Sequence, residues 1–424
     1  MSKTLQAIRG MNDLVPAQTA VWRVVESRLA DIASQFAYQE IRFPIVEQTE
    51  LFKRAVGEST DIVEKEMYTF TDRNGDSLSL RPEGTAPCVR AGLQQGLIVQ
   101  QVQRLWYTGP MFRHERPQKG RYRQFYQFGA ENFGMPGPLA DVELIAMTAQ
   151  FWQSLGITDA VHLEINSLGT PAVRQQHREA LVAYFEQHRD QLDEDSQRRL
   201  STNPLRILDS KNPAMADLIA SAPALSDYFD EVSTAHFTQV KQSLDTCGIT
   251  YRVNPQLVRG LDYYTHTVFE WVTDKLGSQN AICAGGRYDG LVEQIGGKAA
   301  PAVGFALGLE RLILLLEACD KTPETSAVVD VYWVCVGDAA VQQAMQVAQT
   351  LRTAIPTLRL VVDAVGGSFK SQFKRADKSG AAIALILGDD ELASQSVQIK
   401  YLREDKPQKT ILFSELEPCL SRYV

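Results

Sequence analysis

The chain has 424 residues, which is too long for an ordinary lone domain and predicts two or three. Hydrophobic residues make up 44% of it and charged residues 22%, the balance of a soluble globular protein with a substantial core. The formal net charge of −8 argues against a protein that coats nucleic acid or membranes indiscriminately, but it allows a local basic groove.

The first elements in the chain predict a mixture of helices and strands. Apolar residues recur at helical spacing from Pro16 to Phe36, which predicts an amphipathic helix with a proline in its first turn. A short strand, Glu40–Pro44, follows. The segment Met67–Thr85 then has the pattern of a β-hairpin with an Asn-Gly turn, and Pro87 opens another helix.

Two further strands, Arg104–His114 and Arg123–Gly134, flank a basic loop. Strands that pair through hairpins, with helices outside them, predict an antiparallel sheet in an α+β core. The stretch from about Gly169 to Val232 is rich in Gln, Arg, Asp, Leu and Ala, and it predicts a mostly helical insertion in this core.

After residue 327 strands and helices alternate, which predicts a parallel α/β domain of about a hundred residues. Its last strand is so apolar that we expect it to be buried on both faces. The segment Lys321–Ser326 has the composition of a linker, so we divide the chain into domains 1–325 and 328–424. The expected elements are the strand Val328–Val336, the helix Asp338–Ile355, the strand Leu358–Val365, the helix Phe369–Ser379 and the strand Ala381–Gly388.

The basic loop, FRHERPQKGRYRQF at residues 112–125, is the first candidate site. Alternation along a hairpin would bring Arg113, Glu115, Arg123 and Phe125 to one face. Arginine forks suit phosphate oxygens, an aromatic ring can stack on a base, and a carboxylate can receive an exocyclic amine. The loop therefore predicts a nucleotide pocket without a P-loop, although an exposed hairpin with many ion pairs would have the same composition. A second signal, GFALGLERL at residues 304–312, places Arg311 on a helix preceded by small residues.

Metal binding, disulfide bonding and export have no signature in the sequence. The six cysteines form no CxxC pair and the six histidines have no metal-ligand spacing, so we assign no metal ligand. The N-terminus lacks the apolar region of a signal peptide, and no apolar run is long enough to span a bilayer. We therefore expect a cytoplasmic protein without a membrane segment.

The order of these motifs resembles a known family. A strand ending at Pro44, the FRHE…RQF hairpin and the GLERL helix resemble the three motifs of class II aminoacyl-tRNA synthetases. LVRGLDYYT, AGGRYDGL and LRPEGTA, which begin at Leu257, Ala284 and Leu80, resemble signature peptides of the histidyl-tRNA synthetase family. The resemblance covers essentially the whole chain. It implies a class II antiparallel-sheet catalytic core with a helical insertion, a C-terminal α/β anticodon-binding domain, and a homodimer.

The activity that the resemblance implies is that of a histidine–tRNA ligase. Such an enzyme activates L-histidine with ATP to histidyl-adenylate and transfers the histidyl group to the 3′ end of tRNA(His). Two alternatives stay open: a synthetase-like regulatory subunit of histidine biosynthesis, and a class II synthetase for another amino acid. The C-terminal domain and the histidine signatures argue against the first, and LVRGLDYY and AGGRYDGL argue against the second.

The resemblance also implies roles in the ATP site. Arg113 and Arg259 match the two arginines that face the α-phosphate from opposite sides, and we treat both as catalytic. Mg²⁺ is expected to bridge the phosphates. Arg311 matches the arginine on the γ-phosphate side. Glu115 and Phe125 match the residues that read the adenine and stack on it, and Arg121 is also assigned to the ATP site.

Histidine requires a separate set of partners. Its α-ammonium needs acceptors, and each ring nitrogen needs a partner of its own. Glu83 could instead cap the following helix, and a pair of adjacent tyrosines could be ordinary core packing. The residues that match the family's histidine site are Glu83, Thr85 and Gln127 around the ammonium, Glu131 and Tyr264 at the ring with Tyr263 beside them, and in addition Gly84, Arg113 and Arg259.

Contacts with tRNA are expected in two places. The tip of the basic loop lies at the mouth of the pocket, so Arg116, Gln118 and Lys119 are candidates to touch the acceptor end. Lys370 and Lys374 lie one turn apart on a helix of the C-terminal domain. Such a basic stripe suits an RNA backbone, although it is also typical of a solvated helix face.

Overall fold

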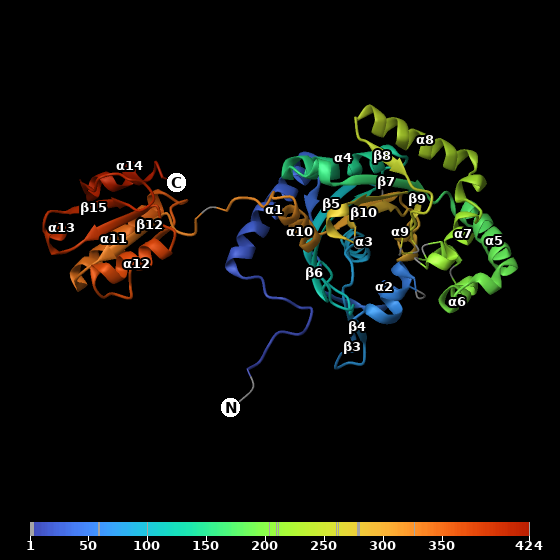
Figure 1. Ribbon diagram of the computed structural model, residues 1–424, viewed down its shortest axis with the longest axis horizontal. Coiled ribbons are helices and arrows are strands. Elements are labelled where there is room, and N and C mark those ends of the chain that lie inside the picture. The colour runs from blue at the N-terminus through green and yellow to red at the C-terminus, as the bar shows by residue number, and fades with distance from the viewer. Residues whose placement is uncertain are drawn as a thin grey trace. The chain divides into compact units, whose positions relative to one another are not determined.

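The computed structural model describes residues 4–57, 60–99, 101–202, 204–208, 210, 212–259, 261, 263–277, 280–325 and 327–423. The chain divides into two compact units, Met1–Pro323 and Glu324–Val424 (Figure 1). Each unit has a sheet and a hydrophobic core of its own.

The first unit is built on an eight-stranded sheet in the order β1-β5-β6-β11-β10-β9-β7-β8. Its neighbouring strands are antiparallel except for the pairs β1–β5 and β7–β8, which are parallel. The predicted α+β core with a largely antiparallel sheet is therefore confirmed. The strands are β1 (Gln39–Glu40), β5 (Gln103–Phe112), β6 (Gln124–Phe133), β7 (His162–Ser167), β8 (Tyr251–Val253), β9 (Thr265–Val272), β10 (Ala281–Arg287) and β11 (Ala302–Gly308).

The two faces of this sheet carry separate hydrophobic clusters. Successive side chains of a strand point to opposite faces, so Trp106 and Tyr107 on β5 enter different clusters. Helices α1, α4, α8 and α10 cover the face of Trp106, and α2, α3 and α9 cover the face of Tyr107 (Figure 1). These helices are α1 (Pro16–Gln35), α2 (Thr49–Val56), α3 (Thr85–Gln94), α4 (Leu139–Leu155), α8 (Glu231–Thr246), α9 (Leu291–Gln294) and α10 (Leu309–Ala318).

The elements near the N-terminus largely follow the sequence. The amphipathic helix is confirmed as α1, with Pro16 at its first position. The predicted hairpin is β3 (Thr69–Thr71) paired with β4 (Ser77–Leu80), and β4 pairs on its other side with β2 (Val46–Gln48). Its turn is held by the Asp72 carboxylate, which accepts from the backbone N–H of Asn74 and of Asp76 at 2.8 and 2.9 Å.

The strand predicted to run to Pro44 was wrong in extent, because β1 ends at Glu40. The guanidinium of Arg81 donates to the carbonyl of Phe43 at 2.9 Å and to that of Pro44 at 3.4 Å. A side chain therefore satisfies these backbone acceptors in place of a neighbouring strand. Helix α3 likewise begins at Thr85, two residues before the proline that was expected to open it.

The described residues of the insertion are mostly helical, as predicted. They form a small cluster of their own around Leu181 and Phe185, both fully buried. Its helices are α5 (Pro171–Gln187), α6 (Glu194–Thr202) and α7 (Ala216–Ala220), joined by short 3₁₀ turns.

The second unit has a five-stranded sheet in the order β13-β12-β14-β15-β16. The three predicted strands are parallel, and every residue of β14 is buried, which confirms the parallel α/β arrangement. The antiparallel pair β15–β16 and two short helices after β14 were not predicted. The elements are β12 (Val331–Cys335), α11 (Asp338–Ala354), β13 (Leu360–Val362), α12 (Phe369–Lys378), β14 (Ile383–Leu387), α13 (Asp389–Ala393), β15 (Ser396–Tyr401), β16 (Lys409–Leu412) and α14 (Leu416–Leu420).

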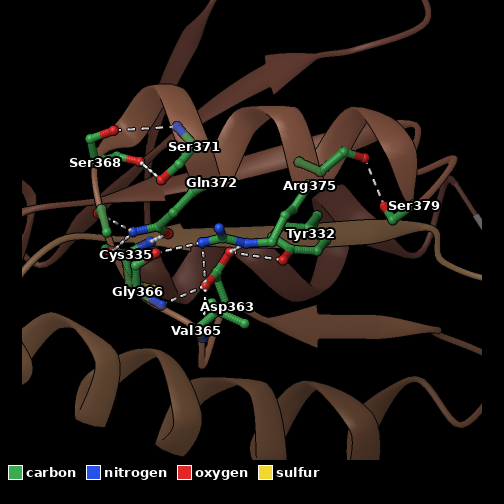
Figure 2. A network of polar contacts seen from close by, with 12 residues as sticks. Tyr332, Cys335, Asp363, Val365, Gly366, Ser368, Ser371, Gln372, Arg375 and Ser379 are labelled. Carbon is green, nitrogen blue, oxygen red and sulfur yellow. Dashed lines mark hydrogen bonds and ion pairs between the residues drawn. The ribbon is translucent and has the colours of Figure 1, made fainter.

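A network of hydrogen bonds holds the loop between β13 and α12 (Figure 2). The buried carboxylate of Asp363 accepts from Nε and Nη2 of Arg375 at 2.8 and 2.9 Å, and from the Tyr332 hydroxyl at 2.8 Å. It also accepts from the backbone N–H of Val365 and of Gly366, each at 3.0 Å. One side chain therefore determines the course of the loop that leads into α12.

Candidate active site

A cavity of about 260 Å³ opens on the face of the first sheet that carries Tyr107. Three segments that are far apart in the sequence supply its arginines: Arg113 follows β5, Arg259 precedes β9, and Arg311 lies on α10. The sequence motifs predicted that these three side chains meet, and the fold brings all of them to the wall of one cavity.

Arg113 is held against the aromatic side of the cavity. Its Nε donates to the carbonyl of Pro82 at 2.8 Å, and its guanidinium lies 5.2 Å from the ring centre of Phe125. The carboxylate of Glu115 is 4.0 Å from Nη1 of Arg113, and it forms a closer ion pair with Arg121. Burial lowers the pKa of Arg113, as expected for a cation withdrawn from water.

The hairpin prediction was right for three of its four residues. Arg113, Glu115 and Phe125 line the cavity, but Arg123 is not among the lining residues. Its Nε donates to the backbone carbonyl of Glu115 at 3.2 Å. The chain leaves the ladder after Phe112, so strict strand alternation does not extend to this side chain.

Arg259 and Arg311 are also fixed by neighbouring groups. Arg259 forms an ion pair with Glu270, and its guanidinium lies 5.8 Å from the ring centre of Tyr264. Arg311 donates from Nε to the carbonyl of Gly120 at 3.2 Å and from Nη1 to that of Ala281 at 2.6 Å. The guanidinium of Arg259 thus faces an acidic partner, whereas that of Arg311 is held by backbone carbonyls.

One end of the cavity carries acceptors suited to an ammonium group. Glu83 and Thr85 line it, and so does Gln127, whose buried Oε1 receives no hydrogen bond from any residue that the structure describes. Glu83 accepts from the backbone N–H of Thr85 at 2.7 Å and of Ala86 at 2.9 Å. It therefore caps α3, as the structural alternative for this residue expected, and it also lines the cavity. Burial raises the pKa of Glu83, against the lowering effect of the two amides.

The adjacent tyrosines also combine two roles. Tyr263 and Tyr264 both line the cavity, with ring centres 4.6 Å apart. Both belong to the hydrophobic cluster on this face of the sheet, as the core-packing alternative expected. Gly84 lies at the start of α3, where a Cβ would overlap the ring of Tyr107.

Glu131 lies behind the cavity wall and is fully buried. Its carboxylate accepts hydrogen bonds from the hydroxyls of Thr85, Tyr107 and Tyr288. Burial raises its pKa to about 8, although all three hydroxyl groups act to lower it. Tyr107 and Tyr288 were not predicted from the sequence, even though Tyr288 lies inside the AGGRYDGL peptide.

The residues expected to touch tRNA lie outside this cavity. Arg116, Gln118 and Lys119 are exposed at the tip of the basic loop. Lys370 and Lys374 are exposed on α12 of the second unit.

Two further properties bear on the class of protein. Within the described ranges, no group of three or more His, Cys, Asp or Glu side chains could hold a metal ion. No helix in the part of the chain that the structure describes is long and apolar enough to cross a membrane.

Comparison with known proteins gives matches along nearly the whole chain. The family model for histidyl-tRNA synthetase matches residues 10–312, and that for an anticodon binding domain matches residues 330–422. The chain is similar to the apo crystal structure of S. aureus histidyl-tRNA synthetase, with 36% identity and a TM-score of 0.84, over 99% of this chain and 100% of that one.

More distant structures share the fold. The histidyl-tRNA synthetase of Nostoc sp. has 19% identity and a TM-score of 0.70, over 99% of both chains. A Bacillus halodurans protein described as an ATP phosphoribosyltransferase regulatory subunit/histidyl-tRNA synthetase has 21% identity and a TM-score of 0.66, over 92% of this chain and 99% of that one.

Proposed function

The chain belongs to the histidyl-tRNA synthetase family of aminoacyl-tRNA ligases, and from this premise we propose which of its residues perform each part of the reaction. The enzyme is a histidine–tRNA ligase of class II fold. It first joins the carboxylate of L-histidine to the α-phosphate of ATP with release of pyrophosphate, and it then passes the histidyl group to the 3′ end of tRNA(His).

The observation that carries the proposal is the convergence of three guanidinium groups on one cavity. Negative charge shifts across the phosphoryl group as pyrophosphate leaves, so positioned cations stabilise the transition state more than the ground state. Arg113 and Arg259 bind the α-phosphate from opposite sides and are the catalytic residues. Arg311 binds the γ-phosphate end.

The nucleoside occupies the part of the cavity beside the basic loop. Adenine stacks on Phe125 and its exocyclic amine donates to Glu115, with Arg121 completing this side. The proposal is supported by the ion pair between Glu115 and Arg121, which holds the carboxylate in place, and by the guanidinium of Arg113 beside the Phe125 ring.

Histidine occupies the acceptor-rich end. Its α-ammonium donates to Glu83, Thr85 and Gln127, beside Gly84 in the same turn. The open Oε1 of Gln127 supports this orientation. The ring is assigned to Tyr264 and Glu131, with Tyr263 adjacent, and its carboxylate lies toward Arg113 and Arg259. Of the two ring partners Tyr264 lines the cavity, whereas Glu131 lies behind the wall and is linked to it through the hydroxyl of Thr85. A site that hydrogen-bonds a polar side chain discriminates by roughly 10⁴–10⁵ against analogues that lack the group.

Mg²⁺ enters as part of the nucleotide substrate. A hard cation of this kind prefers oxygen ligands and is commonly bound through substrate phosphates with one or two carboxylates. Two carboxylates of the cavity wall are Glu270, the ion-pair partner of Arg259, and Glu310, which precedes Arg311 in the chain. Glu310 accepts from the backbone N–H of Tyr126 at 3.0 Å through both oxygens, and burial raises its pKa to about 7, so Glu270 is the better donor to a cation.

Contacts with tRNA are proposed for both units of the chain. The acceptor end reaches the cavity past Arg116, Gln118 and Lys119, and the anticodon region contacts Lys370 and Lys374. We assign residues 1–325 to the catalytic domain and 328–424 to anticodon binding. We also propose a cytoplasmic homodimer, and the six cysteines, all without disulfide bonds, suit a reducing compartment.

The test is histidine-dependent exchange of labelled pyrophosphate into ATP by the purified protein. We expect strong exchange with histidine alone, and loss of exchange in an Arg259→His variant that keeps its fold. Exchange with a different amino acid would indicate another class II specificity. Exchange with none would indicate the regulatory-subunit alternative and would refute the proposal.

A further inference from the structure

The backbone of Tyr126 is bound by a side chain at the point where the neighbouring strand ends. The ladder between β6 and β11 stops at the pair Gln127–Gly308, and α10 begins at Leu309. The N–H of Tyr126 therefore meets no strand on that side in the described part of the chain. Glu310, in the first turn of α10, accepts this N–H through both carboxylate oxygens, each at 3.0 Å.

The other edge of β6 does not supply the same bond. There Tyr126 pairs with Pro110 on β5, and the carbonyl of Pro110 accepts from Nε of Arg81 at 2.9 Å. Loss of the Glu310 carboxylate would therefore leave the N–H of Tyr126 without its acceptor, and this end of β6 would be held by a strand on one edge alone.

The residues on either side of Tyr126 line the cavity. Successive side chains of a strand point to opposite faces, so Phe125 and Gln127 both face the cavity. The Tyr126 ring lies on the other face, with its centre 5.3 Å from that of Trp22. Phe125 is assigned to the adenine and Gln127 to the histidine ammonium. The bond from Glu310 thus fixes the short segment that carries one contact to each substrate.

The next residue of α10, Arg311, is anchored in the same manner. It donates to the carbonyl of Gly120 in the basic loop at 3.2 Å and to that of Ala281 at the start of β10 at 2.6 Å. Two consecutive side chains of α10 therefore bind backbone groups of β6, the basic loop and β10. This arrangement sets the arginine assigned to the γ-phosphate in register with the residues assigned to adenine and histidine.

We propose that Glu310 is a positioning residue for ATP and histidine, which acts through the backbone of Tyr126 rather than as a ligand of Mg²⁺. The inference rests on the proposed roles of Phe125 and Gln127. Positioning requires an acceptor oxygen at the reach of a glutamate side chain, whereas a hard cation is best bound by a charged carboxylate. Substitutions can separate these two requirements.

The test compares Glu310→Gln with Glu310→Asp in the pyrophosphate exchange reaction. Gln keeps the length and one acceptor oxygen but loses the charge, and Asp keeps the charge but is one methylene shorter. The Gln variant should keep the KM for ATP and for histidine within about threefold of the wild type, whereas the Asp variant should raise both about 10-fold. A Gln variant impaired as much as or more than the Asp variant, with a raised requirement for Mg²⁺, would make Glu310 a metal ligand and overturn the proposal.

Glu310→Ala shows whether the effect passes through Phe125. Alone, it should raise both KM values at least as much as Glu310→Asp. Combined with Phe125→Ala, it should raise the KM for ATP by less than about threefold over Phe125→Ala, because the contact that it positions is already absent. A full and independent increase in the double variant would contradict the proposed route.

Asp330→Ala is the matched control. Asp330 is a buried carboxylate of the second unit that accepts the backbone N–H of Arg359 at 2.8 Å, and it is not among the residues that line the cavity. Its removal also deprives a backbone N–H of a carboxylate acceptor. We expect it to lower the stability of the second unit and to leave both KM values unchanged.

The outcomes separate this inference from the proposed function. A wild-type protein without histidine-dependent exchange would refute both. Active wild type, with Glu310→Asp and Glu310→Ala matching Asp330→Ala in both KM values, would refute the positioning role alone. If Glu310→Ala fails to fold, the order of the Gln and Asp variants still decides.

Discussion

Removal of the Arg259 guanidinium provides a quantitative test of transition-state stabilisation at the cavity. In Arg259→Gln, Glu270 loses the partner of its ion pair, and both side chains are 19% exposed in the wild type. A partly exposed pair contributes roughly 1 kcal/mol or less to stability, so we expect the variant to fold. Loss of one positioned donor to developing negative charge costs about 10²–10³ in rate, or about 2.7–4 kcal/mol.

The measurement is the rate of histidine-dependent pyrophosphate exchange at saturating ATP and histidine. Arg104→Gln is the matched control, because Arg104 forms a comparable ion pair with Glu143, at 27% and 24% exposure, outside the cavity. Adding Glu270→Gln to Arg259→Gln should lower the rate further, because Glu270 is also the proposed donor to Mg²⁺. An exchange rate in Arg259→Gln within threefold of the control would show that this guanidinium does not stabilise the transition state.

Three further outcomes are expected. Asp141→Asn leaves the buried guanidinium of Arg287 with only the more exposed Asp289 as a charged partner, and should lower the free energy of unfolding of the first unit by up to about 3–5 kcal/mol, measured by urea denaturation. Lys370→Glu combined with Lys374→Glu should weaken tRNA binding and reduce its salt slope by about 2, while pyrophosphate exchange is unchanged. Burial alone would raise the pKa of Asp363, but its hydrogen bonds outweigh burial and hold the pKa below the ordinary value. Its stabilising contribution should thus persist down to about pH 4 and disappear as the pH falls further. The protection factors of the amides in residues 360–378, corrected for intrinsic exchange at each pH, should fall in this range, and Asp363→Asn should abolish that fall.

The sequence predicted the elements whose periodicity is long or whose turns have strong local signals. Helix α1 and the hairpin β3–β4 are examples, because apolar spacing in one case and an Asn-Gly turn in the other act over few residues. Strand β1 was predicted too long because its end depends on Arg81, which lies about forty positions later in the chain. No local pattern carries that information.

The residues of the candidate site were likewise only partly predictable from the sequence. The ordered motifs were sufficient to predict that Arg113, Arg259 and Arg311 meet, since the resemblance supplies the long-range arrangement that spacing lacks. Tyr107 was missed because a tyrosine in an apolar strand has the same sequence signature as a core residue. Its bond to Glu131 depends on the register of β5 against β6, which only the folded sheet determines.

Position 304 connects the backbone of this sheet to a buried carboxylate. One methyl group there would occupy the space of a carboxylate oxygen, so no other residue can replace the glycine while Glu131 stays where it is. The Glu131 carboxylate is in turn bonded to the hydroxyls of Thr85, Tyr107 and Tyr288. A side chain at position 304 would therefore displace groups on three other elements of the sheet and its covering helix.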